Sequence, residues 1–214
     1  MNTYDYIIKK YKIEVGKQYI VDIPSMGRNN LAELFAELGF TKGLELGVDR
    51  GEYSEILCKI NPHLHLYSVD PWTSAVYEPG KSGVNADQPY FDNRYKETAK
   101  RLTPYNSTII RKTSSDALND FRDESLDFVY IDANHDFPNF IFDIHNWMKK
   151  IKVGGIMSGH DYTIFSYRKF NHVKRALDAY ARSYRMIPLF IVGRFEQRKG
   201  EIRDKYRSFF WVKQ

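Results

Sequence analysis

The stretch SLDFVYIDANHDF, residues 125–137, decides the fold class of this sequence. It contains four consecutive apolar residues, Phe128–Ile131, and then runs into Asp132, His135 and Asp136. A continuous apolar run that is rich in aromatic and β-branched residues is typical of a strand buried on both faces. Such strands belong to parallel sheets that helices cover on both sides. The stretch therefore predicts an α/β fold in which a central strand ends in polar side chains.

Strand and helix patterns alternate along the rest of the chain. Short strands are predicted at residues 42–48, 65–70, 107–112, 126–132, 155–161, 186–192 and 208–213. Helices are predicted at residues 29–40, 52–60, 90–102, 115–121, 139–151 and 172–184. The alternation favours a parallel sheet covered on both faces, and the last two strands, which lack a helix between them, predict an antiparallel edge. Ligands of such folds bind at the carboxyl ends of the strands.

Length and composition limit the classes of protein that fit. The chain has 214 residues, of which 43% are apolar, which predicts one domain over residues 1–214, with residues 1–40 as an N-terminal helical extension. No apolar run is long enough to span a membrane, and the first residues lack the pattern of a secretory signal. Cys58 is the only cysteine, which excludes an internal disulfide and a cysteine-based zinc cluster. We therefore expect a cytoplasmic protein.

The charge of the chain is uneven. The net charge is +5, but residues 165–214 carry thirteen Lys or Arg and four Asp or Glu, so this quarter is at +9 and the remainder at −4. A basic quarter favours an acidic substrate or a nucleic acid. The alternative is a solvated face that keeps the protein in solution, and the sequence leaves both open.

The segment GLELGVDRG, residues 43–51, forms a turn that a ligand can approach closely. Gly47 follows the strand and lets the backbone turn tightly, while Gly51 opens the next helix, whose first N–H groups are free. The spacing differs from the dinucleotide pattern G-x-G-x-x-G. Glu45 interrupts the strand just before this turn, and an acid at this position suits an ammonium group.

Acidic and hydroxyl side chains follow the next two strands. Asp70 ends the strand at residues 65–70, where a carboxylate can accept hydrogen bonds from both hydroxyls of a ribose. Ser115 and Asp116 follow the third strand and are placed to reach an adenine. For Asp116, a role in capping a helix is an equal alternative.

These residues together resemble class I S-adenosylmethionine-dependent methyltransferases. The resemblance rests on Glu45-Leu-Gly47-Val-Asp-Arg-Gly51, on Asp70 and on the strand that ends in Asp132. The later segments VGGIMSGHDY (153–162) and VKRALDAY (173–180) are similar to small-molecule O-methyltransferases of the macrocin O-methyltransferase and cephalosporin-biosynthesis type. The resemblance implies a Rossmann-like, seven-stranded, mostly parallel sheet in the order 3-2-1-4-5-7-6, with strand 7 antiparallel and helices on both faces.

The resemblance also implies that S-adenosylmethionine is the cofactor. Glu45 and the turn at Gly47 are expected at its methionine end and Asp70 at its ribose. The other expected cofactor contacts come from Gly51, Trp72, Ser115, Asp116 and Asp132.

Two acids are predicted to meet at the middle of the sheet. Asp132 ends one strand and Asp161, in SGHDY, ends the next strand along the chain. Neighbouring strands lie about 4.8 Å apart, so two ionised carboxylates here repel unless a proton or a cation lies between them. Oxygen ligands of this kind suit Mg²⁺ or another divalent cation.

His135 is expected to be the general base that takes the proton of the acceptor hydroxyl, with Asp132 and Asp161 completing the catalytic group. One residue departs from the family pattern, because His160 stands where a second acid is usual. The tentative metal ligands are therefore Asp132, His160 and Asp161, and the nitrogen ligand leaves both the presence and the identity of the cation open.

The sequence thus predicts methyl transfer to a hydroxyl of a small molecule, such as a sugar or a natural product, without a membrane partner. Arg28 and the loop at residues 73–89 are expected to contribute to the acceptor pocket. A nucleic-acid methyltransferase that uses the basic quarter is the disfavoured alternative, because DANHDF replaces the run typical of amino-methylating enzymes. A non-catalytic cofactor-binding subunit and a nicotinamide-dependent oxidoreductase are weaker alternatives, and a homo-oligomeric state is left open.

Overall fold

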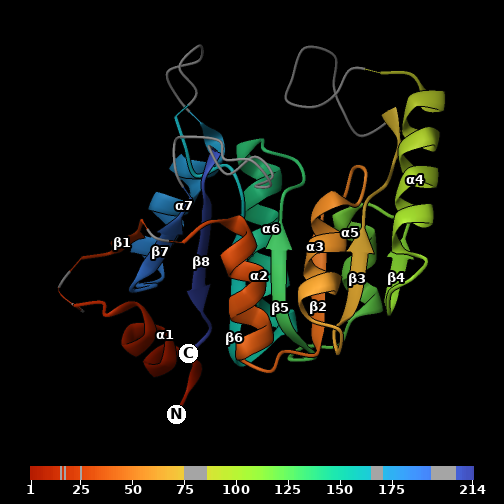
Figure 1. Cartoon of the computed structure of the whole chain (residues 1–214). Coiled ribbons are helices and arrows are strands. Elements are labelled where there is room, and N and C mark those ends of the chain that lie inside the picture. The colour runs from red at the N-terminus through yellow and green to blue at the C-terminus, as the bar shows by residue number, and fades with distance from the viewer. Residues whose placement is uncertain (15, 17, 25, 75–85, 165–170, 194–205) are drawn as a thin grey trace.

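One mixed β-sheet organises the protein (Figure 1). The computed structural model describes residues 1–14, 16, 18–24, 26–74, 86–164, 171–193 and 206–214. The strands of these residues are β1 (Ile20–Ile23), β2 (Lys42–Leu46), β3 (His65–Val69), β4 (Ser107–Ile110), β5 (Leu126–Ile131), β6 (Ile151–Gly159), β7 (Leu189–Val192) and β8 (Ser208–Val212). The helices are α1 (Thr3–Tyr11), α2 (Arg28–Glu37), α3 (Glu52–Ile60), α4 (Gln88–Leu102), α5 (Ser114–Ala117), η2 (Leu118–Asp120), α6 (Phe137–Lys150) and α7 (His172–Ser183).

The strand order confirms the fold expected from the sequence, with one strand added. The order in the described residues is β1-β7-β8-β6-β5-β2-β3-β4, in which β8 is antiparallel to both β6 and β7. Without β1 this is the predicted order 3-2-1-4-5-7-6. The predicted count of seven strands was one too low, because β1 pairs in parallel with β7 at the edge of the sheet. Residues 1–40, which we expected to be helical, therefore contain a strand between α1 and α2.

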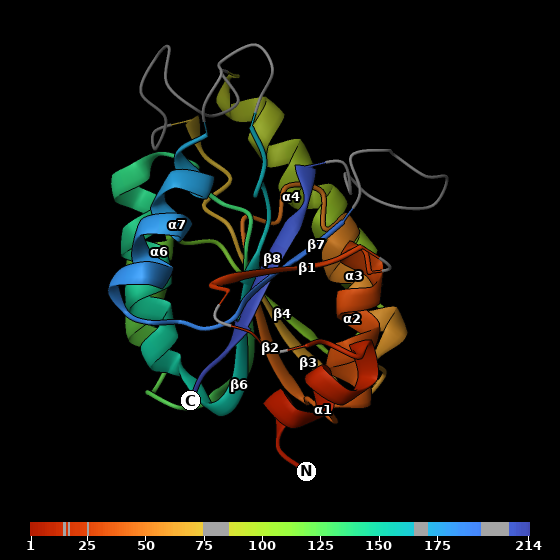
Figure 2. The ribbon, with the colours of Figure 1, turned by 90° about the vertical axis from the view of Figure 1, so that its left-hand side faces the viewer.

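Helices cover both faces of the sheet (Figure 2). The strand β5 shows why, because all six of its residues are buried and successive side chains point to opposite faces. Val129 and Ile131 pack in the cluster that includes residues of α6 and α7. Phe128 and Tyr130 pack in the cluster that includes residues of α1, α2 and α3. The apolar run that predicted this strand is therefore the centre of two cores.

None of the helices in the described part of the chain is long and apolar enough to cross a membrane. The loop predicted at residues 73–89 lies partly outside the described residues, at 75–85, and α4 begins within its last residues, at Gln88.

The turn after β2 brings the backbone of two strands into close contact. Gly47 has φ +82°, and a Cβ atom at this position would lie 2.1 Å from the carbonyl oxygen of Asp132. Its N–H donates to the carbonyl oxygen of Val69 at 2.9 Å, and the N–H of Asp132 donates to the carbonyl oxygen of Leu46 at 2.8 Å. A side chain at position 47 is therefore excluded both by the backbone dihedral and by the neighbouring strand.

We expect Gly47→Ala to destabilise the protein more than Gly39→Ala does. Gly39 also has a positive φ, of +71°, but a Cβ there meets no atom within 4 Å, so alanine at position 39 adds only left-handed strain, about 1–2 kcal/mol. Alanine at position 47 adds a steric clash to this strain, which costs roughly another 1–3 kcal/mol. Urea denaturation of the two variants measures the difference, and equal losses would contradict the packing described here.

Candidate active site

A cavity of about 770 Å³ opens at the carboxyl ends of the parallel strands. The segments that follow β2, β3, β4 and β5 line it, and so do the first turns of α2, α3, α4 and α6. The position is the one that the strand order predicted, since ligand sites of such sheets lie beyond the carboxyl edge. A volume of this size is typical of a small-molecule site.

Asp70 holds the glycine turn in place. Its Oδ2 atom accepts hydrogen bonds from the N–H groups of Val48 and Asp49 at 2.9 and 3.1 Å, and its Oδ1 atom accepts one from the N–H of Trp72 at 2.8 Å. Burial raises the pKa of Asp70, although these three N–H groups act in the opposite direction. Because each carboxylate oxygen has about two acceptor sites, the two N–H groups fill Oδ2, and Oδ1 keeps a site for one further hydrogen bond.

Glu45 lies in the wall of the cavity and is almost completely buried, with 2% of the residue exposed. Its carboxylate accepts a hydrogen bond from the hydroxyl of Ser54, and an Arg28 Nη2 atom lies 4.0 Å away. Burial raises the pKa of Glu45 to about 8, although Arg28 and Ser54 act in the opposite direction. A cationic ligand group would favour the ionised form of this buried acid.

Arg28 connects α2 to the middle of the sheet. It is 3% exposed, and its Nη2 atom lies 3.1 Å from Oδ2 of Asp132. The guanidinium carbon lies 4.0 Å from the ring centre of Tyr53 and 4.9 Å from that of Tyr130. The guanidinium group thus combines an ion pair with two aromatic contacts, the arrangement for which arginine suits buried sites.

Of the other residues expected at the cofactor, some line the cavity and some do not. Trp72 and Ser115 are part of its wall. Trp72 is 1% exposed and donates from Nε1 to the carbonyl oxygen of Asp49 at 2.8 Å. Gly51 precedes α3 with φ +73° and is not one of the residues that line the cavity. Asp116 is exposed outside the wall, where its Oδ2 atom accepts a hydrogen bond from the hydroxyl of Thr113 at 2.7 Å.

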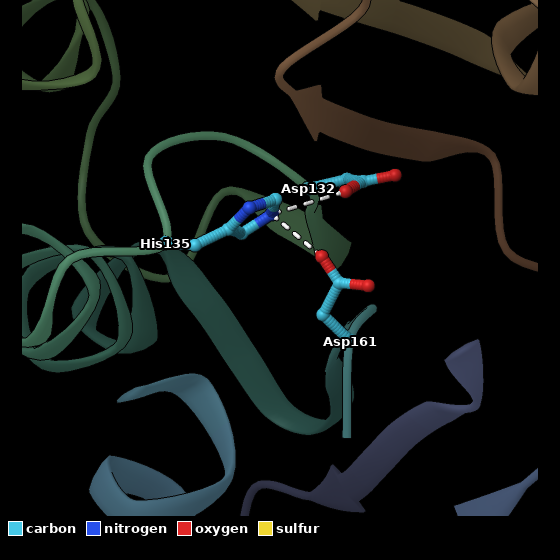
Figure 3. Close-up of side chains that lie close together, drawn as sticks. All are labelled: Asp132, His135 and Asp161. Atoms are coloured by element: carbon cyan, nitrogen blue, oxygen red, sulfur yellow. Dashed lines mark ion pairs between the residues drawn. The ribbon is translucent and has the colours of Figure 1, made fainter. Parts of the chain in front are cut away.

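Two acids and two histidines meet at the ends of β5 and β6. Figure 3 shows the His135 ring between the carboxylates of Asp132 and Asp161, with its Nε2 atom 3.4 Å from the first and 3.0 Å from the second. His160 is 2% exposed, and its Nδ1 atom lies 3.7 Å from Oδ2 of Asp132 and 3.4 Å from Oδ1 of Asp161. Asp161 has φ +64°, a strained conformation for a residue with a side chain.

The charges of this cluster compensate one another. Burial on its own raises the pKa of Asp132, but the interactions with His160, His135 and Arg28 reverse the shift and lower it. Burial likewise opposes a charged ring at His135, but the carboxylates of Asp132 and Asp161 reverse that shift and raise its pKa. The ligand-free cluster therefore favours two carboxylates beside an imidazolium ring.

Three of these side chains can hold a cation. One ligand atom each from Asp132, His135 and Asp161 lie within 4.8 Å of one another. Two carboxylates and an imidazole suit a divalent cation of borderline character as well as Mg²⁺. The third candidate ligand in this geometry is His135, whereas the sequence analysis predicted His160 as the third ligand.

Asp143 and Ser114 are polar residues of the cavity wall that the sequence analysis did not predict. Asp143, in the middle of α6, is 3% exposed, and its Oδ1 atom accepts a hydrogen bond from the hydroxyl of Ser114. Burial raises the pKa of Asp143 to about 7, against the effect of Ser114. The available signal was helical spacing, because Asp143 shares a helix face with the buried residues Phe140 and Trp147.

Solved structures with a similar fold are methyltransferases. An O-methyltransferase from Bacillus cereus in complex with S-adenosylhomocysteine is 14% identical, with a TM-score of 0.58 over 87% of this chain and 80% of that one. The O-methyltransferase TomG of tomaymycin synthesis from Streptomyces achromogenes, in complex with S-adenosylmethionine, is 14% identical, with a TM-score of 0.59 over the same shares. The N-methyltransferase NodS from Bradyrhizobium japonicum is 16% identical, with a TM-score of 0.52 over 87% of this chain and 95% of that one.

A curated protein also matches a short part of the sequence. The uncharacterized protein y4gI from Sinorhizobium fredii (strain NBRC 101917 / NGR234) is 33% identical over 55 residues. These residues make up 26% of this chain and 6% of y4gI, so the chain spans only a small part of the length of that relative.

The sequence also matches a protein family. Residues 44–162, more than half of the chain, match the family described as methyltransferase domain. This range begins in β2, ends just after Asp161 and contains the glycine turn, Asp70 and the acid–histidine cluster. The chain therefore belongs to the methyltransferase-domain family, and its fold is that of the class I S-adenosylmethionine-dependent methyltransferases.

Proposed function

We propose that this protein transfers a methyl group from S-adenosylmethionine to a hydroxyl group of a small molecule. One observation supports the proposal, namely that Asp70 and Gly47 line the same cavity of about 770 Å³ as His135 and Asp132. In this proposal, the methyl donor and the residue that accepts the proton therefore lie side by side in one cavity.

The wall of the cavity offers a partner for each part of the donor. In the proposed complex, the remaining acceptor site of Asp70, on Oδ1, receives a ribose hydroxyl. The methionine end lies over the turn at Gly47, where backbone can approach closely because a side chain is excluded. Its ammonium group faces Glu45, which is ionised most readily when a cation lies beside it.

His135 is the proposed general base. Its Nε2 atom is buried and lies 3.4 and 3.0 Å from the two carboxylates, which leaves Nδ1 as the ring nitrogen that takes a proton in this proposal. A third of the side chain, 34%, is exposed, so the ring can reach a bound acceptor. When the ring takes the proton of the hydroxyl, Asp132 and Asp161 stabilise the imidazolium that forms.

The transfer itself balances without another reactant. The bond between the sulfur and the methyl carbon breaks as the bond from the acceptor oxygen to that carbon forms. The electron pair remains on sulfur, which becomes the thioether of S-adenosylhomocysteine, and the proton of the hydroxyl goes to Nδ1 of His135. Before this step the ring must be neutral, and positive charge that enters the site with the sulfonium lowers the pKa that the two carboxylates raise.

A hydroxyl acceptor explains the cluster better than an amine does. A hydroxyl must lose its proton during transfer, whereas a neutral amine attacks with a free lone pair and needs no base in that step. The fold does not decide between them, because O- and N-methyltransferases both share it. The nucleic-acid alternative relies on residues 165–214, of which 165–170 and 194–205 lie outside the described residues. Cytoplasmic location and self-association stay predictions of the sequence.

A divalent cation fits the same cluster. With His135 acting as the base, Asp132 and Asp161 would hold it through their oxygens, and a cation held there would supply a positive charge that lowers the pKa of an acceptor hydroxyl. Charge balance does not require the cation, since Arg28 and the imidazolium form of His135 already compensate the two carboxylates. We therefore propose cation assistance as a separate, testable part of the function.

The first test is donor binding. Calorimetric titration of the protein with S-adenosylhomocysteine and, separately, with NADH compares the two nucleotide classes. The proposal requires saturable binding of S-adenosylhomocysteine and no binding of NADH, and the reverse result would favour an oxidoreductase.

We expect His135→Ala to lose turnover and to keep its affinity for S-adenosylhomocysteine. Removal of a general base lowers the rate by about 10²–10⁴-fold. The readout is release of S-adenosylhomocysteine with an acceptor identified by screening hydroxylated small molecules. His65→Ala is the matched control, because His65 lies at the opposite end of β3 and contacts Thr108. Unchanged turnover of His135→Ala would show that the base is assigned wrongly.

We expect removal of divalent cations to reduce turnover, and Mg²⁺ or Mn²⁺ to restore it. Dialysis against EDTA followed by readdition tests this. Asp161→Asn should weaken Mn²⁺ binding, measured by calorimetry, because it removes one charged oxygen ligand. Asp178→Asn, which alters an acid paired with Lys174 outside the cluster, should leave Mn²⁺ binding unchanged. Full activity in EDTA would exclude cation assistance.

A further inference from the structure

Asp161 has a strained backbone at a point where its side chain meets the proposed base. Its φ of +64° lies in the left-handed region, which a residue with a Cβ atom adopts only where surrounding contacts determine it. Its Oδ2 atom lies 3.0 Å from Nε2 of His135, and Figure 3 shows the two side chains facing each other. The contacts that hold this backbone therefore also place the carboxylate against the imidazole ring.

Hydrogen bonds hold the backbone on both sides of Asp161. On the side of the strand, the N–H of His160 donates to the carbonyl oxygen of Ile131 in β5 at 3.0 Å. On the other side, the carbonyl oxygen of Asp161 accepts from the N–H of Thr163 at 2.8 Å and from Nδ2 of Asn171 at 2.9 Å. Of these three donors only Asn171 uses its side chain, so this is the hydrogen bond that a substitution can remove.

Asn171 uses both ends of its amide group. It is the N-cap of α7, where its Oδ1 atom accepts a hydrogen bond from the N–H of Val173 at 2.8 Å. An N-cap needs only this acceptor, which aspartate or serine supplies about as well as asparagine. The residue is 4% exposed, and its amide NH₂ group is spent on the carbonyl oxygen of Asp161. This donor is what asparagine offers at position 171 beyond a helix cap.

The helix α7 also contacts the neighbouring parts of the site. The Nδ1 atom of His172 lies 3.8 Å from Oδ1 of Asp136, in the loop that carries His135. The hydroxyl of Tyr162 donates to Oδ1 of Asp178 at 2.7 Å, which joins the segment after β6 to the same helix. Residues 172–183 lie outside the range 44–162 that matches the methyltransferase-domain family. The helix thus supports the cluster from a part of the chain beyond the family match.

We propose that Asn171 is a positioning residue of the methyl transfer, which holds Asp161 in its left-handed conformation and thereby directs the carboxylate of Asp161 at His135. The inference rests on the proposed function, in which His135 is the base. Asn171 is not one of the residues that line the cavity, so it acts through Asp161.

Two substitutions separate this hydrogen bond from the helix cap. Asn171→Asp and Asn171→Ser both keep an oxygen that caps α7, and both remove the amide NH₂ group that bonds to Asp161. Only the first adds a charge, so an effect that both variants share belongs to the lost hydrogen bond. Asn2→Asp and Asn2→Ser are the matched controls, because Asn2 caps α1 with an Oδ1 atom that accepts from the N–H of Asp5 at 2.8 Å.

The measurements are kcat, KM for the acceptor and Kd for S-adenosylhomocysteine. A displacement of about 1 Å can cost about 10²-fold in rate, so we expect both variants at position 171 to lower kcat by about 10–10²-fold. We expect KM and Kd to change by less than about twofold, because the hydrogen bond lies outside the cavity wall. Both variants at position 2 should keep the kcat of the wild-type protein.

A second background tests whether Asn171 acts through Asp161. Asp161→Gly removes the carboxylate and leaves a residue that tolerates the left-handed backbone. Adding Asn171→Ser to this variant should lower kcat by no more than about twofold, because no carboxylate is left to position. A crystal structure of Asn171→Ser gives a readout that does not depend on turnover. In it we expect the distance from Oδ2 of Asp161 to Nε2 of His135 to exceed the present 3.0 Å.

Four outcomes would overturn the inference. They are a wild-type kcat in both variants at position 171, an equal loss in the variants at position 2, the full loss of Asn171→Ser repeated in the Asp161→Gly background, and an unchanged distance between Asp161 and His135 in the crystal structure. If instead the wild-type protein transfers no methyl group, the proposed function fails, while the crystal structure of Asn171→Ser still decides whether Asn171 positions Asp161. The two failures are therefore distinguishable.

Discussion

The buried charge of Asp132 is the constraint on which the site depends. The side chain of Asp132 is 10% exposed, and its carboxylate lies 3.1 Å from Arg28 and 3.4 Å from His135. Burial of an ion is tolerated only when its partners replace the lost hydration, and here the partners come from α2 and from the loop after β5. The guanidinium group of Arg28 in turn lies against Tyr53 and Tyr130, which belong to the core. The carboxylate of Asp132 thus connects α2, the strands of the core and the loop that carries His135.

The two ends of the cavity have different chemical character. At the ends of β5 and β6, carboxylates and imidazoles are close enough to exchange protons and to hold a cation. At the end of β4, Ser114, Trp147 and Asp143 form a short chain of hydrogen bonds. In the proposed function this chain contacts the ligand and takes no part in the methyl transfer. Asp70 lies between the two ends and fixes the backbone of the glycine turn. A ligand with a reactive cation at one end and a heterocycle at the other matches this division.

The elements with strong local patterns could be predicted from the sequence, and those that depend on distant partners could not. The apolar run of β5 and the acids that end β3 and β5 were found because strand patterns and their polar ends are local signals. The strand β1 was missed because its four residues are stabilised by pairing with β7, near the other end of the chain. Arg28, which was expected near the acceptor, does line the cavity, but nothing local reveals its ion pair with Asp132, a residue 104 positions away. Asp143 was hidden within an apolar helix, where its neighbours in sequence are core residues.

A crystal structure of the complex with S-adenosylhomocysteine would show which residues each part of the donor contacts. We expect a ribose hydroxyl on Asp70, the homocysteine over Gly47, the sulfur toward His135 and the purine beside Ser114. A nucleoside bound elsewhere on the protein, or one lying in the cavity with its sulfur turned away from His135 and Asp132, would contradict it.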